Sequence, residues 1–214
     1  MKYPVVILSF LISCNSNHHD KNIFVKPNTV IKHDTIYINP ATDTSWQEGF
    51  GLTHDPDVDS VWGKPVSYYL DDPKCVGIAF EFYYGYFRPS DNGATAELLK
   101  YAVSDNNKLR PFYRWCLNKT IQISDGALSE YTGEPALNYA EKFPKEFFEY
   151  MDQDTTGKRY VDWMGEISYS GFDTNDNKSK TPEIKRVIQT MKSNCKSCNA
   201  LILRWIEKFA KDCY

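Results

Sequence analysis

Apolar residues between positions 109 and 120 are spaced as in an amphipathic helix, and this pattern constrains the fold more than any other part of the sequence. The residues of the stripe are Leu109, Phe112, Tyr113, Cys116, Leu117 and Thr120. The residues outside it are polar: Arg110, Arg114, Asn118 and Lys119. Separations of three, four, seven and eight positions place side chains on one face of an α-helix. The sequence therefore predicts a helix here that buries its apolar stripe.

The C-terminal part of the chain shows the same period twice. Thr181 has the character of an N-cap, and Pro182 and Glu183 follow it in an order typical of a helix start. Apolar residues then recur at helical intervals: Ile184, Val187, Ile188 and Met191. A second amphipathic pattern covers residues 200–211. Together they predict a helical hairpin.

Shorter helical patterns occupy much of the remaining sequence. They cover residues 94–103, 135–142, 144–151 and 159–169, while residues 73–87 fit either a helix or a buried strand. Prolines stand at the starts of these patterns, and none is expected inside a helix. The prediction is an all-α domain over residues 45–214. Roughly six to eight short amphipathic helices would pack there in a compact or solenoid-like bundle.

The N-terminus has the pattern of a targeting segment. Lys2 precedes an apolar run over residues 3–12, which is about ten residues long and too short to span a membrane. The run ends in Leu11-Ile12-Ser13-Cys14. This tetrapeptide resembles the lipobox of bacterial lipoproteins, and the resemblance covers residues 1–14. A plain secretory signal, with an incidental cysteine, is the alternative.

The lipoprotein resemblance implies a location and a membrane partner. It implies removal of residues 1–13 as a signal peptide and attachment of acyl chains to Cys14, which would anchor the protein to a bacterial membrane. Residues 14–44 would then form an extended tether before the helical domain. Ser16 stands where such lipoproteins carry an aspartate for inner-membrane retention. The expected location is therefore the outer membrane of the cell envelope, facing the periplasm.

Charge excludes one class of partner. The chain has 25 Lys and Arg residues against 28 Asp and Glu residues, a formal net charge of −3, and both signs are interleaved. Nucleic-acid binding needs a basic stripe that neutralises phosphates, and the sequence has none. We therefore expect no nucleic-acid partner.

Two acidic segments partly match a calcium loop. Asp55, Asp57 and Asp59 alternate in the first segment, but the glycine and the late glutamate of an EF-hand loop are absent. The segment is therefore either an acidic turn or a structural calcium site, and no other cofactor is expected. The second segment, residues 152–157, has the glycine, but Trp163 replaces the bidentate carboxylate. We interpret it as a helix end followed by a turn.

Cysteines offer disulfides in an oxidising compartment. The candidates are Cys75, Cys195, Cys198 and Cys213, whereas Cys116 belongs to the predicted buried stripe. A helix over residues 199–212 would separate Cys198 and Cys213 by about 22 Å, too far for a bridge. The Cys195-x-x-Cys198 segment could close locally, act as a redox dithiol or supply half of a zinc site.

An aromatic run follows the ambiguous segment. Tyr83, Tyr84, Tyr86 and Arg88 are candidates for a ligand or partner surface, with core packing as the alternative. No nucleophile elbow, phosphate loop or zinc-protease motif occurs in the sequence, and no catalytic residue is predicted. A catalytic pair of carboxylates that are distant in sequence but close in the fold stays an open alternative.

The leading functional hypothesis is a non-catalytic domain that binds an envelope protein or peptide. The alternatives are an inhibitor or immunity protein against a wall-degrading toxin, and a glycan-binding lipoprotein.

Overall fold

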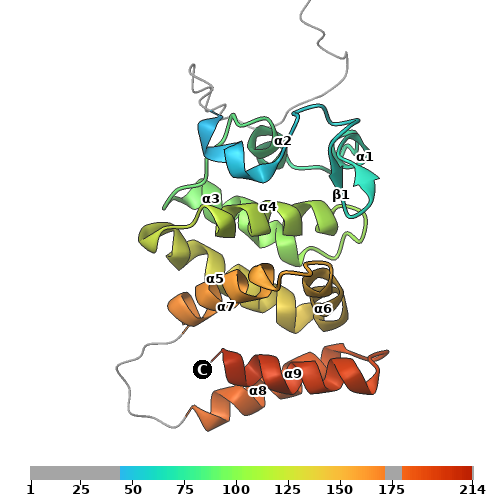
Figure 1. The fold of residues 1–214 in the computed structure, drawn as a ribbon, viewed down its shortest axis with the longest axis vertical. Helices are drawn as coiled ribbons and strands as arrows, with labels where there is room; N and C mark the ends of the chain where they lie inside the picture. The colour runs from blue at the N-terminus through green and yellow to red at the C-terminus, as the bar shows by residue number, and fades with distance from the viewer. Residues whose placement is uncertain (1–43, 172–179, 214) are drawn as a thin grey trace, which may run out of the picture. The chain divides into compact units, whose positions relative to one another are not determined.

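The structure is a computed structural model that describes residues 44–171 and 180–213. The predicted signal peptide, the lipidation residue Cys14 and the tether as far as residue 43 lie outside the described residues. Within them the predicted all-α class is confirmed (Figure 1). None of the described helices is both long enough and apolar enough to cross a membrane.

The first part of the described chain is the least regular. It contains the 3-10 helix η1 (Ser45–Phe50), a small antiparallel hairpin and two short helices, α1 (Ser67–Leu70) and α2 (Gly77–Tyr83). The hairpin pairs β1 (Ser60–Val61) with β2 (Lys64–Pro65), with Ser60 opposite Pro65. Residues 73–87, which fitted either a helix or a buried strand, are helical only over α2 in their middle. Soon after α2 the backbone turns at Gly85, whose φ of 76° is the left-handed region that favours glycine.

Helix α3 (Gly93–Leu99) and the 3-10 helix η2 (Lys100–Val103) precede helix α4 (Arg110–Gln122) in the chain. Helix α4 is central to the packing of the domain. It contacts α2, α3, η2, β1 and two later helices. The predicted stripe is buried as expected, with Cys116 and Leu117 fully covered. The expectation that polar residues lie outside the buried region is wrong for Arg110, Arg114 and Asn118, which are also buried. The reason is that neighbours surround α4 on more than one side.

One of the three middle helices, α5, starts at a different residue than predicted. Helix α5 (Gly126–Lys142) begins well before the expected start at Pro135, because the side chain of Asp125 caps it by accepting from Leu128 N at 3.1 Å. Pro135 therefore lies inside a helix, contrary to the expectation. Helices α6 (Pro144–Asp152) and α7 (Lys158–Gly171) agree closely with the predicted ranges.

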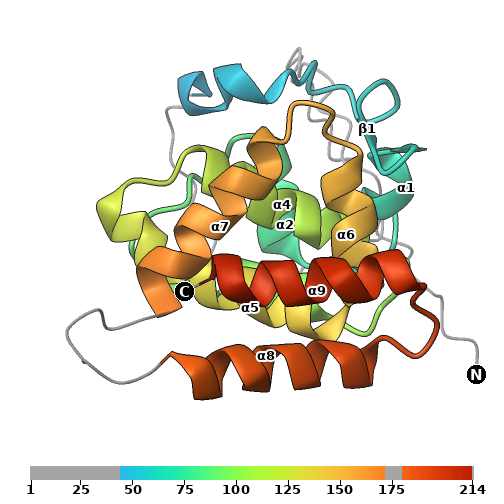
Figure 2. The same cartoon turned by 60° about the horizontal axis from the view of Figure 1, so that its bottom comes forward.

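The predicted C-terminal hairpin is present. Helix α8 (Thr181–Asn194) packs against α9 (Ala200–Asp212), and α8 also contacts α5 while α9 contacts α6 (Figure 2). Thr181 is the first helical residue and not the cap, which is Lys180 without a side-chain cap bond. The core continues into this hairpin, since the Phe147 and Phe209 rings lie 5.1 Å apart.

Candidate binding surface

A buried carboxylate fixes the loop over residues 53–59. Asp59 is only 7% exposed and accepts hydrogen bonds from the backbone N–H of Thr53 at 3.0 Å and of His54 at 3.0 Å. It also accepts from the Thr53 hydroxyl at 2.9 Å and the Tyr83 hydroxyl at 2.7 Å. Burial alone raises the pKa of Asp59, but these hydrogen bonds outweigh it and hold the pKa below its usual value. The loop is therefore fixed from within.

The same loop is tied to η1 and α2 through one glutamine. The side chain of His54 lies 2.9 Å from Oε1 of Gln47, so His54 Nε2 donates this bond. Gln47 in turn donates from its Nε2 to the carbonyl of Phe82 at 2.8 Å. His54 adopts a positive φ of 59°, which the surrounding bonds stabilise. The loop, η1 and the end of α2 therefore form one connected unit.

The three predicted calcium ligands point to different environments. Asp59 faces the core, whereas Asp55 and Asp57 are exposed, and Asp55 accepts the backbone N–H of Asp57 at 3.0 Å. Val58, which follows Asp57, is 65% exposed. Across residues 44–171 and 180–213, no three His, Cys, Asp or Glu side chains gather in a way that would hold a metal ion. The loop therefore presents two carboxylates and an apolar tip to solvent.

The aromatic run divides between core and surface. Tyr83 was predicted to lie on a partner surface, but it is fully buried. Its hydroxyl instead donates a hydrogen bond to Asp59 inside the protein. Tyr84 is half-buried and Tyr86 is 50% exposed, with their rings 6.0 Å apart and 22° from parallel. Phe80 is 43% exposed and lies 4.6 Å from Tyr84, centroid to centroid. Arg88 is exposed.

The acidic loop and these rings form one surface, here called the acidic–aromatic face: Asp55, Asp57, Phe80, Tyr84 and Tyr86. Burial raises the pKa of Tyr84, and Tyr86, Asp55 and Asp57 raise it further because their charges act on its hydroxyl. The Asp59–Tyr83 hydrogen bond connects the two halves beneath this surface. Two groups that the sequence suggested separately are therefore neighbours.

A pocket of about 640 Å³ lies elsewhere, between the α6–α7 turn and α9. Its apolar lining is Phe148, Met151, Tyr160 and Trp205, and its polar lining is Asp152, Asp154, Thr155, Thr156, Gly157 and Lys208. The pocket could not be predicted from the sequence, because its lining comes from three helices that are brought together only by the tertiary fold. The one available signal was the segment 152–157, which forms the predicted turn after α6.

Side-chain contacts shape the pocket wall. The rings of Phe148 and Trp205 lie 5.6 Å apart, and Lys208 Nζ lies 5.2 Å from the Tyr160 ring centroid. The Tyr160 hydroxyl donates to Asp212 at 2.8 Å. Asp152 is exposed and makes no ion pair among the described residues. An aromatic wall with a polar rim and one unpaired carboxylate is suited to a ligand with an apolar face and hydroxyl or cationic groups.

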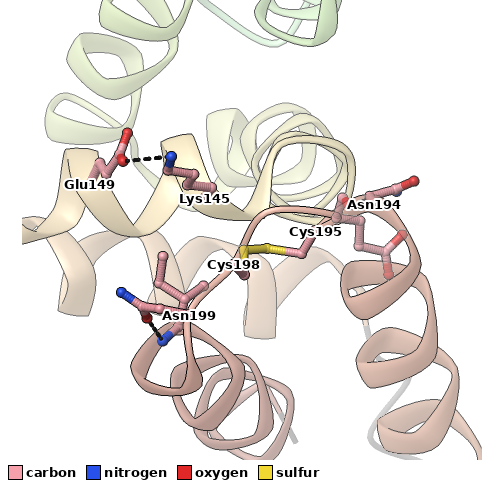
Figure 3. The surroundings of a disulfide bond; sticks show 8 residues. Lys145, Glu149, Asn194, Cys195, Cys198 and Asn199 are labelled. Atoms are coloured by element: carbon pink, nitrogen blue, oxygen red, sulfur yellow. Dashed lines mark hydrogen bonds and ion pairs between the residues drawn. A yellow bond between two sulfur atoms is a disulfide. The ribbon is translucent and has the colours of Figure 1, made fainter.

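One disulfide closes the corner of the C-terminal hairpin (Figure 3). It joins Cys195, which caps the end of α8, to Cys198, and their Cα atoms lie 5.4 Å apart. The next residue, Asn199, caps α9 by accepting from Ile202 N at 3.0 Å. Of the sequence-derived options for this segment, the structure has local closure.

The remaining described cysteines are free thiols. Cys75 is half-buried, and Cys116 and Cys213 are buried. Burial raises the pKa of Cys75 and of Cys213 to about 12, and that of Cys116 well above its ordinary value. Cys75 and Cys213, which the sequence offered as disulfide partners, are therefore thiols with little tendency to ionise.

The acidic–aromatic face and the pocket use different residues. The face is built on the loop over residues 53–59 and on α2, whereas the pocket is built on α6, α7 and α9. A substitution in the face therefore leaves the pocket lining unchanged, and the reverse also holds.

No protein family, no curated protein and no solved structure matches this chain.

Proposed function

We propose that this protein is a lipid-anchored protein of the bacterial envelope whose helical domain binds an envelope protein or peptide through the acidic–aromatic face. The resemblance of Leu11-Ile12-Ser13-Cys14 to a lipobox supports the location. The observation that carries the binding role is the Asp59–Tyr83 bond of 2.7 Å beneath this face. It holds an exposed acidic loop beside exposed aromatic rings.

The chemistry of the face indicates the kind of partner. Exposed tyrosine and phenylalanine rings bury much apolar area in an interface, and carboxylates at its edge select partners of opposite charge. The loop is already held by four donors to Asp59, so binding orders little of the chain. The partner is therefore a protein or peptide with basic and apolar groups on its contact surface.

The inhibitor hypothesis is a specific form of this proposal. Asp55, Asp57 and the exposed Val58 form an acidic projection that would fit a basic substrate cleft. In this form the partner is a wall-degrading toxin, and binding blocks its activity. An activity assay of the captured partner with and without the domain distinguishes an inhibitor from a scaffold.

Glycan binding is a second candidate, supported by the pocket and not by the face. Trp205 and Tyr160 contribute aromatic rings, and Thr155, Thr156 and Asp152 contribute hydroxyl and carboxylate oxygens. Sugars present an apolar ring face and several hydroxyl groups, which match such a lining. Sedimentation with purified cell wall tests this candidate. Retention that Trp205→Ala abolishes supports it, and retention that this change leaves intact counts against it.

Crosslinking in the native envelope tests the leading proposal. The full-length wild type should capture one basic envelope protein, and Asp55→Asn with Asp57→Asn should weaken its binding by about tenfold or more. Glu130→Gln with Glu134→Gln is the matched control, since it also removes two exposed carboxylates but from α5. Equal binding by both double variants, or capture of no protein, would refute a role for the face.

Lipid attachment is tested separately. Cells fed an alkyne-labelled palmitate should label the wild type and leave Cys14→Ser unlabelled. Membrane fractionation should show the wild type in the outer membrane and the variant released. An unlabelled wild type would refute the anchor while leaving the binding proposal to be judged on its own experiment.

A further inference from the structure

The pocket between the α6–α7 turn and α9 has an aromatic wall. Its volume is about 640 Å³, and Phe148, Tyr160 and Trp205 are among the residues that line it. The rings of Phe148 and Trp205 lie 5.6 Å apart, so they pack against each other. The Tyr160 hydroxyl donates to Asp212 at 2.8 Å, so its proton is not available to a ligand. The wall therefore offers mainly apolar and π surface.

Carboxylates outnumber cations around this wall. The charged residues of the lining are Asp152, Asp154 and Lys208. Lys208 forms an ion pair with Asp212, the residue that also binds Tyr160, so the charge of Lys208 is compensated. Arg159 does not line the pocket, and its guanidinium packs against the Tyr150 ring and donates to the Tyr150 carbonyl. The pocket therefore has an excess of negative charge, which attracts cations.

The two carboxylates of the α6–α7 turn have different roles. Asp154 accepts the Thr156 hydroxyl at 2.6 Å and the backbone N–H groups of Thr156 at 3.0 Å and Arg159 at 2.7 Å. These bonds, that of the hydroxyl first, lower the pKa of Asp154 to about 2, so its carboxylate is ionised at neutral pH. Asp152 is exposed and makes no ion pair within residues 44–171 and 180–213. Asp154 therefore fixes the turn, whereas the Asp152 carboxylate is available to a ligand.

Lys208 shows which group such a wall stabilises. Its ammonium nitrogen lies 5.2 Å from the Tyr160 ring centroid and is paired with Asp212. A cation beside both an aromatic ring and a carboxylate is attracted by each of them. Trp205 has the ring that attracts cations most strongly, and Asp152 supplies an unpaired carboxylate in the same lining. The pocket therefore offers this pair of groups a second time, to a cation from outside the protein.

We propose that the pocket binds an organic ammonium group, with the Trp205 ring contacting the cation and Asp152 pairing with its charge. The apolar body of the ligand packs against the aromatic wall. Small amines such as choline carry this group, and so do the free amino groups of amino-sugar chains. The proposal rests on the pocket put forward above for glycans and narrows its ligand to a cation. It is independent of the acidic–aromatic face.

Isothermal titration calorimetry of the full chain tests the role of the charge. Choline and its uncharged isostere dimethylbutanol have the same shape, so the difference between their affinities measures the effect of the positive charge. We expect choline to bind at least about fivefold more tightly. Asp152→Asn should weaken choline binding about two- to fivefold and leave the alcohol unaffected. Asp57→Asn removes an exposed carboxylate that does not line the pocket, and this control should bind choline as the wild type does.

A second variant separates the aromatic ring from its apolar volume. Trp205→Leu keeps an apolar side chain beside Phe148 but removes the π face, so the preference for choline over the alcohol should fall to about twofold or less. An unchanged circular dichroism spectrum shows that the variant is folded.

A glucosamine tetramer and its N-acetylated form identify the source of the ammonium group. Tighter binding of the free-amine tetramer than of choline indicates an amino-sugar chain. Binding of choline without binding of the tetramer indicates a small amine. In either case, Asp152→Asn should weaken the ligand that binds.

Several results would overturn the proposal. Equal binding of choline and the alcohol, or binding of neither choline nor the free-amine tetramer, shows that the pocket does not select a cation. Binding of the N-acetylated tetramer alone has the same meaning, but it leaves glycan binding at the pocket standing. A loss of choline affinity in Asp57→Asn as large as that in Asp152→Asn also overturns the proposal, because the pocket carboxylate then has no special role.

Discussion

Asp59 is a buried carboxylate held by hydrogen-bond donors, and it makes no ion pair with any residue that the structure describes. Four donors from Thr53, His54 and Tyr83 replace the water that its charge would otherwise bind. Charge-assisted hydrogen bonds of this kind each contribute about 1.5 to 3 kcal/mol. Asp59 therefore links the acidic loop to α2 more strongly than a neutral side chain of similar shape could.

We expect Asp59→Asn to lower the free energy of unfolding by about 2 kcal/mol, because the amide accepts more weakly and directs an NH₂ group at donors. Urea unfolding followed by circular dichroism measures this change. Asp57→Asn, an exposed neighbour, should unfold like the wild type. Equal midpoints for the two variants would contradict the role assigned to Asp59.

The effect of Asp59→Asn on the free energy of unfolding should also depend on pH. The pKa of Asp59 is lower in the folded protein than the ordinary value of 3.8, so its stabilising contribution is complete above that value. The contribution is lost as the pH falls through the folded pKa. The stability difference between wild type and Asp59→Asn should therefore shrink below about pH 4. A difference that stays constant down to pH 2 would refute this account.

Sequence alone could not distinguish Asp59 from its neighbours. Asp55, Asp57 and Asp59 occupy alternate positions in one segment, and all three looked equivalent as metal ligands. What separates them is the Tyr83 hydroxyl, 24 residues further along the chain. Local spacing can suggest which residues share a loop, but only the tertiary fold decides which one turns inward.

At the scale of elements, helical periodicity located most helices, while caps decided their ends. The predicted ranges for α4, α6, α7 and α9 agree with the structure because each has a clear apolar stripe. The start of α5 was misplaced, because Pro135 looked like a helix start and the Asp125 cap was overlooked. The β1–β2 hairpin has only two residues in each strand, lacks a periodic signal and was missed.

Pro135 leads to a prediction about α5. A proline inside a helix removes one backbone hydrogen bond and crowds the preceding turn. Pro135→Ala should raise the free energy of unfolding by about 1 to 2 kcal/mol, after allowing for the greater freedom of the unfolded chain. Chemical denaturation measures the gain. Pro182→Ala, in the first turn of α8, gives no such gain because no bond is missing there. A destabilised Pro135→Ala would contradict the prediction.

The disulfide at the α8–α9 corner closes a very short loop. Its sequence separation of three residues limits the entropy that it removes from the unfolded chain. Replacing Cys195 and Cys198 with serine should therefore cost about 2 kcal/mol or less. The helical circular dichroism should be unchanged, because Val187, Met191 and Ile206 remain buried in the hairpin. Loss of helical signal in this variant would show that the bridge, and not the packing, holds the hairpin.

At the scale of the whole molecule, a buried ionic network joins α4, α5 and α6. Arg114 is almost fully buried and donates to Glu146 and to the Tyr139 hydroxyl at 2.9 Å. Its guanidinium also lies 4.2 Å from the Trp62 ring and 4.0 Å from the Tyr150 ring. The sequence placed Arg114 on the polar side of α4, since periodicity describes one face and cannot show how many neighbours a helix has. The Arg114 side chain of α4 therefore contacts the β1–β2 hairpin, through Trp62, as well as helices α5 and α6.

Removing the carboxylate from this network should be costly. Glu146→Gln leaves two buried guanidinium groups without a counter-charge, and we expect the free energy of unfolding to fall by about 3 kcal/mol. Glu149→Gln is the control one turn along α6, where the pair with Lys145 is exposed and spans 3.8 Å. It should change stability by less than about 0.5 kcal/mol. Similar losses for both variants would mean that the network contributes no more than a surface pair.

The attachment of η1 has a mechanical consequence. Gln47 hydrogen-bonds to the carbonyl of Phe82 at the end of α2, and the carbonyl of Phe50 accepts from Lys119 on α4. The close approach of η1 requires glycine at position 85, where a Cβ would lie 2.6 Å from Cγ2 of Thr44. Tension applied to the chain ahead of Thr44 would load the bond from Gln47 to α2 first and the contact of Phe50 with α4 next. Peeling the domain apart from its first residues therefore requires attachments to two different helices to fail in turn.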